Sequence, residues 1–151
     1  MREIADLAET KALVGQEVAV SDWVAITQQR IDGFADATND HQWIHVDAER
    51  CKRESPYGTT VAHGFLTLAM VPAMLQNALR LADVGMAINY GLNKVRFPAP
   101  VPVGSRLRAH LTILAVHELA EGAQIDWGVT IEREGSDKPV CAAEFLMRRY
   151  P

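Results

Sequence analysis

Cysteine and long apolar runs are scarce in this sequence. The two cysteines, Cys51 and Cys141, are spaced neither as metal ligands nor as a disulfide framework, so we expect reduced thiols, one of them in a strand. No apolar run approaches the roughly 20 residues that cross a membrane. Residues 1–7 carry acids where a signal peptide would have a basic start and an apolar stretch. These absences predict a cytoplasmic protein that is not inserted in a membrane.

Basic residues are also in the minority. The chain has 15 Lys and Arg against 19 Asp and Glu, a formal net charge of −4 at pH 7, and its basic residues do not cluster. This balance argues against a nucleic-acid partner and against an anionic membrane surface. The patterns Gly-x-Ser-x-Gly, Gly-Lys-Ser/Thr and Gly-x-Gly-x-x-Gly are absent. We therefore do not expect a serine hydrolase, a Walker-type nucleotide-binding protein or a dinucleotide-binding protein of the common kinds.

What is present is an ordinary globular composition, with 48% hydrophobic residues in 151, which suits one domain over residues 1–151. The first half has mainly helical spacing. Thr27 suits the N-cap of one helix, and Pro72 predicts a kink or interruption in a long, buried, apolar helix. The helices are expected at residues 2–13, 28–37, 46–52 and 60–81, and a strand at residues 18–26.

After Gly85 the apolar residues alternate, as they do in strands. Residues 98–104 form a Pro-rich turn or edge segment, and the breaks at 121–122 and 135–137 suit hairpin turns. One buried helix followed by about four antiparallel strands is an α+β arrangement. The helix covers one sheet face, so the other face and the edges are left to solvent or to a second copy, and we expect a dimer. The strands are expected at residues 87–97, 107–117, 124–132 and 139–149.

The stretch Thr38-Asn39-Asp40-His41-Gln42-Trp43-Ile44-His45-Val46-Asp47 is the richest in reactive side chains. In a loop, Asp40 and His45 could converge on one water molecule, one accepting its proton and the other orienting it or donating. Alternatively, Asp40 caps a helix and His45 is a hydrogen-bonded structural histidine; spacing alone favours this second interpretation. Asp47 is expected to cap the helix that follows.

A zinc site is a further alternative, because His41 and His45 are four residues apart and His63 or Asp40 could add a third ligand. No Glu lies between the histidines, and Trp43-Ile44 is unusual in a metal-binding helix. We therefore expect no metal here.

The segment Ala62-His63-Gly64-Phe65-Leu66-Thr67 introduces the long apolar helix. A Gly at the start of a helix exposes its backbone N–H at the positive end of the dipole, where it could hold a developing oxyanion. Gly64 could equally be present only to allow a tight chain entry into the helix. Further along, Lys94 and Arg96 share one face of a strand and could meet a phosphate or form ion pairs at a subunit contact.

These segments resemble a known family. The stretch from Phe34 to Asp47 is similar to the hydratase motif of MaoC-like (R)-specific enoyl-CoA hydratases. Within it, the sequence Asp-His-Gln-Trp-Ile-His is most similar to that of the nodulation-protein-N-like branch. The segments at 62–67 and 89–104 resemble the family's second and third signatures. The resemblance covers most of the chain, in order.

The resemblance implies a hot-dog fold, in which a curled antiparallel sheet wraps a helix, usually in a homodimer. It also implies reversible hydration of trans-2-enoyl-CoA to (R)-3-hydroxyacyl-CoA without a metal or redox cofactor. By motif position, Asp40 and His45 activate the water, the Gly64 N–H polarises the thioester carbonyl, and the Thr67 hydroxyl supports the aspartate. His63 is counted with the substrate-binding residues of the second signature.

Two departures from the motif affect substrate range. Asn39 replaces a Gly, which is tolerable because Asn also adopts left-handed geometry, and Gln42-Trp43 replaces Asn-Pro, so Gln42 could take over the positioning role of the carboxamide. The alternatives are a dehydratase acting on carrier-protein substrates, a thioesterase of the same fold, and a non-catalytic acyl-CoA-binding module. A carrier protein would require a basic patch, for which Lys94, Arg96, Arg106 and Arg108 are candidates.

Overall fold

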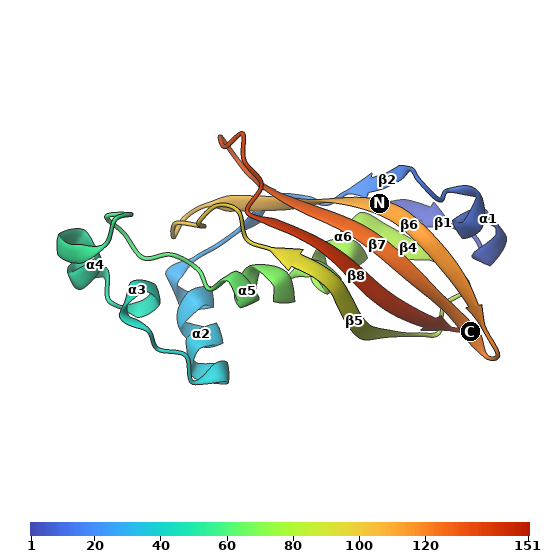
Figure 1. Ribbon diagram of the computed structural model, residues 1–151, viewed down its shortest axis with the longest axis horizontal. Coiled ribbons are helices and arrows are strands. Elements are labelled where there is room, and N and C mark those ends of the chain that lie inside the picture. Colours follow the sequence, from blue (N-terminus) through green and yellow to red (C-terminus); the bar gives the residue numbers. More distant parts are fainter.

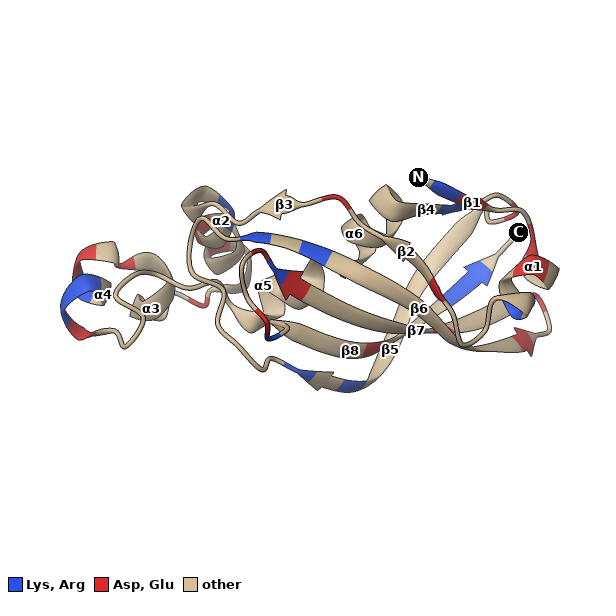
Figure 2. Cartoon of the chain, turned by 90° about the horizontal axis from the view of Figure 1, so that it is seen from above, with Lys and Arg blue, Asp and Glu red and all other residues tan.

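The computed structural model, which describes residues 1–151, has a curled antiparallel sheet arching over two short helices (Figure 1). Seen from above, α3 (Trp43–Val46) and α4 (Ala48–Glu54) extend beyond one end of the sheet, and α1 (Leu7–Ala12) lies at the opposite end (Figure 2). In chain order the elements are β1 (Arg2–Ile4), α1 (Leu7–Ala12), β2 (Glu17–Val20), β3 (Val24–Ala25), α2 (Gln28–Thr38), α3 (Trp43–Val46), α4 (Ala48–Glu54), α5 (Gly64–Ala69), α6 (Val71–Ala78), β4 (Leu79–Leu81), β5 (Met86–Arg96), β6 (Arg106–Leu119), β7 (Gly122–Arg133) and β8 (Cys141–Tyr150).

The main sheet has the strand order β2-β6-β7-β8-β5, with β3 also paired to β6, and all of its pairs are antiparallel. Alternate side chains of β6, β7 and β8 face the helices, as the predicted alternation requires. This inner face, with α5 and α6 against it, forms the apolar core. Its largest fully buried members on the sheet are Leu107, Leu111, Ile113, Ile125, Trp127 and Ile131. The α+β fold class and the four long strands are thereby confirmed.

The long helix is shorter than predicted. The chain is extended up to His63, α5 begins only at Gly64, and residues 79–81 form β4 instead of a last helical turn. The predicted interruption is present and falls at Met70, between α5 and α6, while Pro72 lies in the first turn of α6. Proline is tolerated in a first helical turn because those N–H groups have no intrahelical acceptor.

Two predictions near the N-terminus are wrong in their bounds. The helix predicted at residues 2–13 is shorter, and the strand predicted at residues 18–26 is divided in two. Residues 2–4 form β1, which pairs in parallel with β4, because this places Ile4 fully in the core. The helix α1 starts after Asp6, whose side chain accepts a hydrogen bond from the Glu9 N–H. Residues 18–26 are divided into β2 and β3, both paired to β6.

Several local predictions are confirmed. The Thr27 hydroxyl caps α2 by accepting the Arg30 N–H at 3.2 Å, and the Asp47 carboxylate caps α4 by accepting the Arg50 N–H at 2.9 Å. Both cysteines are free and buried, Cys141 within β8, where burial raises the pKa of its thiol to about 11. None of the helices has the length and apolar character needed to cross a membrane.

Candidate active site

The reactive stretch is a sharp turn between helices. Asn39 ends α2 in the left-handed region, with φ 57°, as anticipated for a residue that stands in place of a glycine. The next N–H, that of Asp40, donates to the Ala35 carbonyl at 3.1 Å. Residues 43–46 then form the short helix α3, of which only residue 46 was predicted as helical, and the helix predicted at 46–52 is α4, at residues 48–54. This turn leaves Asp40 exposed on one side, while α3 carries His45 inwards.

Asp40, His45 and His63 meet at one point, although they come from a loop, α3 and the segment before α5. Each offers a ligand or hydrogen-bonding atom within 4.8 Å of the others. The imidazole rings of His45 and His63 stack with centroids 3.7 Å apart, and both are buried. An Asp40 carboxylate oxygen lies 3.9 Å from Nε2 of His63. The structure therefore brings the predicted acid and base together with a second histidine.

Backbone carbonyls determine the tautomers of both histidines. Nδ1 of His45 lies 2.6 Å from the Val61 carbonyl, so it must carry the proton and donate, which leaves Nε2 with a free lone pair. Nε2 of His63 lies 3.0 Å from the Asp40 carbonyl and donates to it in the same way. His63 thus attaches the start of α5 to the turn that carries Asp40, and acts as a positioning residue.

Burial keeps His45 neutral. Removal from water lowers the pKa of its imidazole below the ordinary 6.5, and the His63 ring lowers this pKa further. The hydrogen bond to Val61 and the Asp40 carboxylate raise the pKa, but they do not reverse the shift. A neutral imidazole with Nδ1–H already bonded to a carbonyl can accept a proton only through Nε2. His45 is consequently suited to act as an acceptor towards water.

A second layer of residues holds α3 in place, and sequence reasoning missed it. The Gln28 carboxamide donates to the His45 carbonyl at 2.8 Å and accepts from the Thr60 hydroxyl at 2.5 Å. Phe34 packs its ring 5.0 Å from that of His63. Gln28 is the first residue of α2 and is half-buried, and nothing in its sequence context distinguishes it from other polar helix residues.

Gly64 and Thr67, the two other predicted site residues of the second signature, both lie on α5. Gly64 is the first residue of α5, so its N–H has no intrahelical acceptor. A Cβ on Gly64 would come within 2.9 Å of the Phe97 ring, so a glycine is required for this ring to lie against the helix. The Thr67 hydroxyl is buried and forms no hydrogen bond, to Asp40 or to any other group. The predicted support of the Asp40 carboxylate by this hydroxyl is therefore not formed.

Two predicted polar groups do not join the site through their side chains. Gln42 is exposed and forms no side-chain hydrogen bond, although its backbone N–H approaches Asp40 at 3.4 Å. His41 turns to the surface and pairs with Asp36 at 2.8 Å. The His41–His45 zinc pair considered above therefore does not form. Asp40, His45 and His63 do offer ligand atoms within 4.8 Å of one another, but Nδ1 of His45 and Nε2 of His63 already face backbone carbonyl groups.

Known proteins share much of this sequence. The profile of the family described as "MaoC like domain" matches residues 9–132. The 3-hydroxyacyl-thioester dehydratase Z of Mycobacterium tuberculosis is 52% identical over 149 residues, which cover 98% of each chain. Nodulation protein N of Rhizobium meliloti is 41% identical over 148 residues, covering 97% of this chain and 91% of that protein.

Solved structures show the same fold. The unliganded R-hydratase PhaJ1 from Pseudomonas aeruginosa superposes with a TM-score of 0.73 at 23% identity, over 91% of this chain and 81% of that one. The HadBC (3R-hydroxyacyl-ACP dehydratase) complex from Mycobacterium tuberculosis superposes with a TM-score of 0.71 at 16% identity, over 91% and 96%. The predicted hot-dog fold is confirmed by these neighbours.

Proposed function

The chain belongs to the MaoC-like family and is a hydro-lyase of the hydratase and dehydratase kind, and from this premise we propose that it reversibly adds water to trans-2-enoyl-CoA to give (R)-3-hydroxyacyl-CoA. The observation that carries the proposal is the convergence of Asp40 and His45 beside the start of α5. The proposed reaction requires no metal or redox cofactor, because a general base and an oxyanion donor suffice for conjugate addition of water.

In the proposed mechanism, one water molecule lies between the Asp40 carboxylate and Nε2 of His45. As its oxygen bonds to Cβ of the substrate, the water loses one proton to this pair and the C=C π electrons move towards the thioester. The Gly64 N–H, at the positive end of α5, stabilises the resulting enolate oxygen. The pair then returns a proton to Cα. Because the hydroxide and the proton come from one face, the addition is syn.

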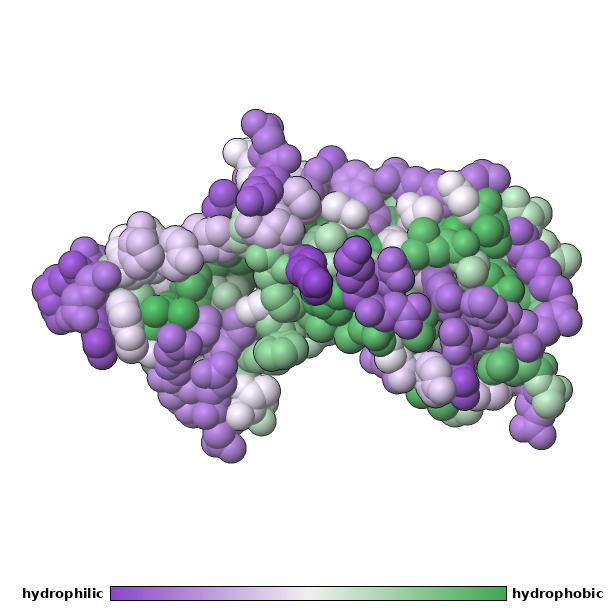
Figure 3. Space-filling view, in the orientation of Figure 1, coloured by the Kyte–Doolittle hydropathy of each residue, from purple (hydrophilic) through white to green (hydrophobic).

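An apolar groove offers room for the acyl chain. One cavity of about 350 Å³ lies between α5 and β5, and a second of about 610 Å³ lies further along α6. The two adjoin, because Pro72, Asn89 and Phe145 line both. Figure 3 shows apolar side chains in the middle of this face and again towards the end opposite α3 and α4, with polar side chains between them. We infer that the acyl chain extends from Gly64 along α5 into this groove.

We also propose that the protein forms a homodimer in which the β5 edges of two copies pair. β5 is an edge strand that pairs only with β8, and nearly all of its residues are exposed, including Met86, Ile88, Tyr90 and Leu92. A long edge with exposed apolar side chains is a template for pairing with another strand. The edge also borders the acyl groove, so a partner there would close the groove.

Changing Ile88 to Asp is expected to weaken this dimer more than tenfold, because a charge would replace an apolar side chain at the paired edge (about 1.4 kcal/mol for each factor of ten). Sedimentation measurements over a range of concentrations would give the dissociation constant. Val14→Asp is the matched control, because both side chains are 42% exposed and Val14 lies in the turn after α1. A wild-type protein that sediments as a monomer would contradict the proposed dimer.

As the pH is lowered, kcat/KM is expected to fall with an apparent pKa below 6.5. The lowered pKa of His45 keeps the imidazole neutral to lower pH, and protonation of Nε2 would then remove the acceptor for water. The profile can be measured with crotonyl-CoA. The exposed His41→Gln variant should keep the same acid limb. An acid limb at or above 6.5 would contradict the role assigned to His45.

The proposed activity is tested directly with crotonyl-CoA. A hydratase lowers the absorbance of the conjugated enoyl thioester without releasing free thiol, and chiral analysis should show the (R)-3-hydroxy product. Release of thiol would indicate a thioesterase. Turnover of a carrier-protein thioester in place of the CoA thioester would indicate a dehydratase that acts on carrier-protein substrates.

A further inference from the structure

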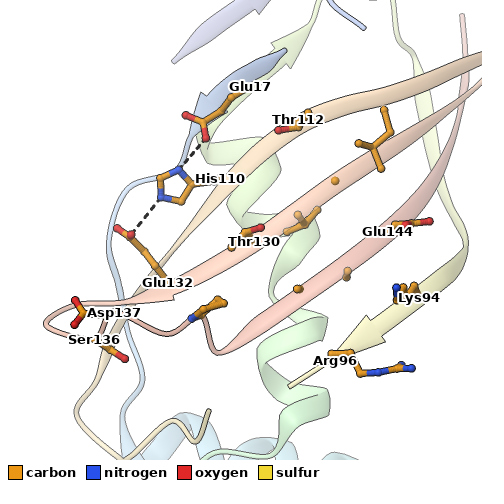
Figure 4. Close-up of a pocket in the computed structure, with 16 residues that line it drawn as sticks. Glu17, Lys94, Arg96, His110, Thr112, Thr130, Glu132, Ser136, Asp137 and Glu144 are labelled. Carbon is orange, nitrogen blue, oxygen red and sulfur yellow. Dashed lines mark hydrogen bonds and ion pairs between the residues drawn. The ribbon is translucent and has the colours of Figure 1, made fainter. Parts of the chain in front are cut away.

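Two unpaired cations lie where β5 ends. Lys94 and Arg96 are two residues apart on the outer face of the strand, and both are exposed (Figure 4). Neither forms an ion pair, although Glu144 is the register partner of Lys94; the Arg96 guanidinium donates only to the Val95 carbonyl, at 2.7 Å. Their charges are therefore free to meet an anion.

The two other candidate arginines are already occupied. Arg106 pairs with Glu134, and Arg108 with Glu132. Both also lie over the Trp23 ring, with guanidinium carbons 5.6 and 4.4 Å from its centroid. Of the four basic residues that the sequence suggested, only the pair on β5 remains available.

An exposed aromatic pair connects these cations to the candidate active site. Phe97 follows Arg96 directly, and its ring lies against Gly64. Phe65, the next residue of α5, is 70% exposed and meets the Phe97 ring edge-on, with centroids 6.3 Å apart. Gly64 follows His63, whose ring stacks on His45. A ligand held by the cations would thus reach the reacting centre by passing over two exposed rings.

We propose that Lys94 and Arg96 bind the phosphate groups of coenzyme A, and that Phe65 and Phe97 line the path of its pantetheine arm to Gly64. This inference rests on the proposed function. It gives the substrate two directions from Gly64: the acyl chain extends along α5, and the coenzyme extends over the rings to the end of β5. Arg and Lys are the side chains suited to phosphate, since both donate charge-assisted hydrogen bonds.

The surrounding charge favours a compact phosphate over an acidic carrier protein. The hollow of about 730 Å³ on the outer sheet face, beside the two cations, is also lined by Glu17, Glu132, Asp137 and Glu144 (Figure 4). Glu132 is paired with Arg108, and the other three carboxylates beside two cations would repel a broad acidic surface. A phosphate can meet the cations at the edge of the hollow without covering the carboxylates.

The test compares crotonyl-CoA with the crotonyl thioester of N-acetylcysteamine, which has the same acyl group but no phosphates. Lys94→Gln and Arg96→Gln should each lower the ratio of the two kcat/KM values about fivefold, as expected for one exposed ionic contact. The double variant should lower it about 25-fold. Lys11→Gln is the control: it removes the same charge at the other end of the sheet, where Lys11 pairs with Glu118.

Binding of coenzyme A itself, measured by calorimetry, separates this inference from the proposed function. If the wild type hydrates neither thioester, the proposed function fails, and weaker binding of coenzyme A to the double variant would still support the phosphate site. An unchanged ratio and unchanged binding in the double variant would overturn the inference. So would a double variant that loses turnover of a carrier-protein thioester while keeping that of crotonyl-CoA.

Discussion

Replacing Asp40 with Asn is expected to lower kcat for crotonyl-CoA hydration by about 10²–10⁴-fold, the usual loss when a general acid or base is removed. Asn keeps the shape and the oxygen that approaches the Gln42 N–H, but it cannot take a proton from water. The Asp40 side chain is 53% exposed, so the fold should survive the change. Stopped-flow or steady-state absorbance would measure the rate, and circular dichroism with thermal unfolding would report the fold.

Asp36→Asn is a close control for this variant. Asp36 lies four residues earlier, at the surface, and its carboxylate pairs with His41, away from His45 and His63. Loss of this exposed pair should leave kcat within about twofold, because surface ion pairs contribute little. Equal losses in both variants would mean that the rate depends on the negative charge around the end of α2 and not on a proton transfer at Asp40.

The predictable parts of the fold are those in which each residue's immediate neighbours decide its conformation. The caps at Thr27 and Asp47 each depend on a side chain and the N–H three residues later, and the left-handed turn at Asn39 depends on that residue's own backbone preference. Alternation in β6, β7 and β8 likewise follows from one buried face. These features could be predicted because no distant contact opposes them.

The errors arose where tertiary contacts overrode local preference. Residues 2–4 have helical spacing but become a strand, because β4 offers them a parallel partner and the core accepts Ile4. The apolar residues of 79–81 continue a helical pattern, yet they supply the other half of that pair. Neither outcome can be deduced from a window of sequence, since each segment is defined by the other.

The candidate site also has one part that the sequence predicts and another part that only tertiary contacts determine. Motif position identified Asp40 and His45, and the structure brings them together with His63. Sequence reasoning could not show that Val61 fixes the tautomer of His45, because this depends on an extended segment lying beside α3. The role of Gln28 was invisible for the same reason: its partners, His45 and Thr60, are 17 and 32 residues away.

Replacing His45 with Gln is expected to lower kcat by at least about 10²-fold. The Gln amide can still donate to the Val61 carbonyl, as Nδ1 of the imidazole does at 2.6 Å, but it offers no lone pair on nitrogen for the water proton. The site is buried, so a loss of about 1–3 kcal/mol in the free energy of unfolding is also expected from imperfect hydrogen bonding. His41→Gln, which changes the exposed histidine on the same turn, should retain nearly full activity.

The Asp40→Asn, His45→Gln double variant distinguishes a shared water from two separate contributions. If both side chains act on one water molecule, removing the second after the first costs little, and the double variant should be nearly as active as the slower single variant. If they act independently, their losses multiply, and the rate should fall by about 10⁴-fold or more. Multiplying losses, with folding intact in all three variants, would reject the proposed water between the Asp40 carboxylate and Nε2 of His45.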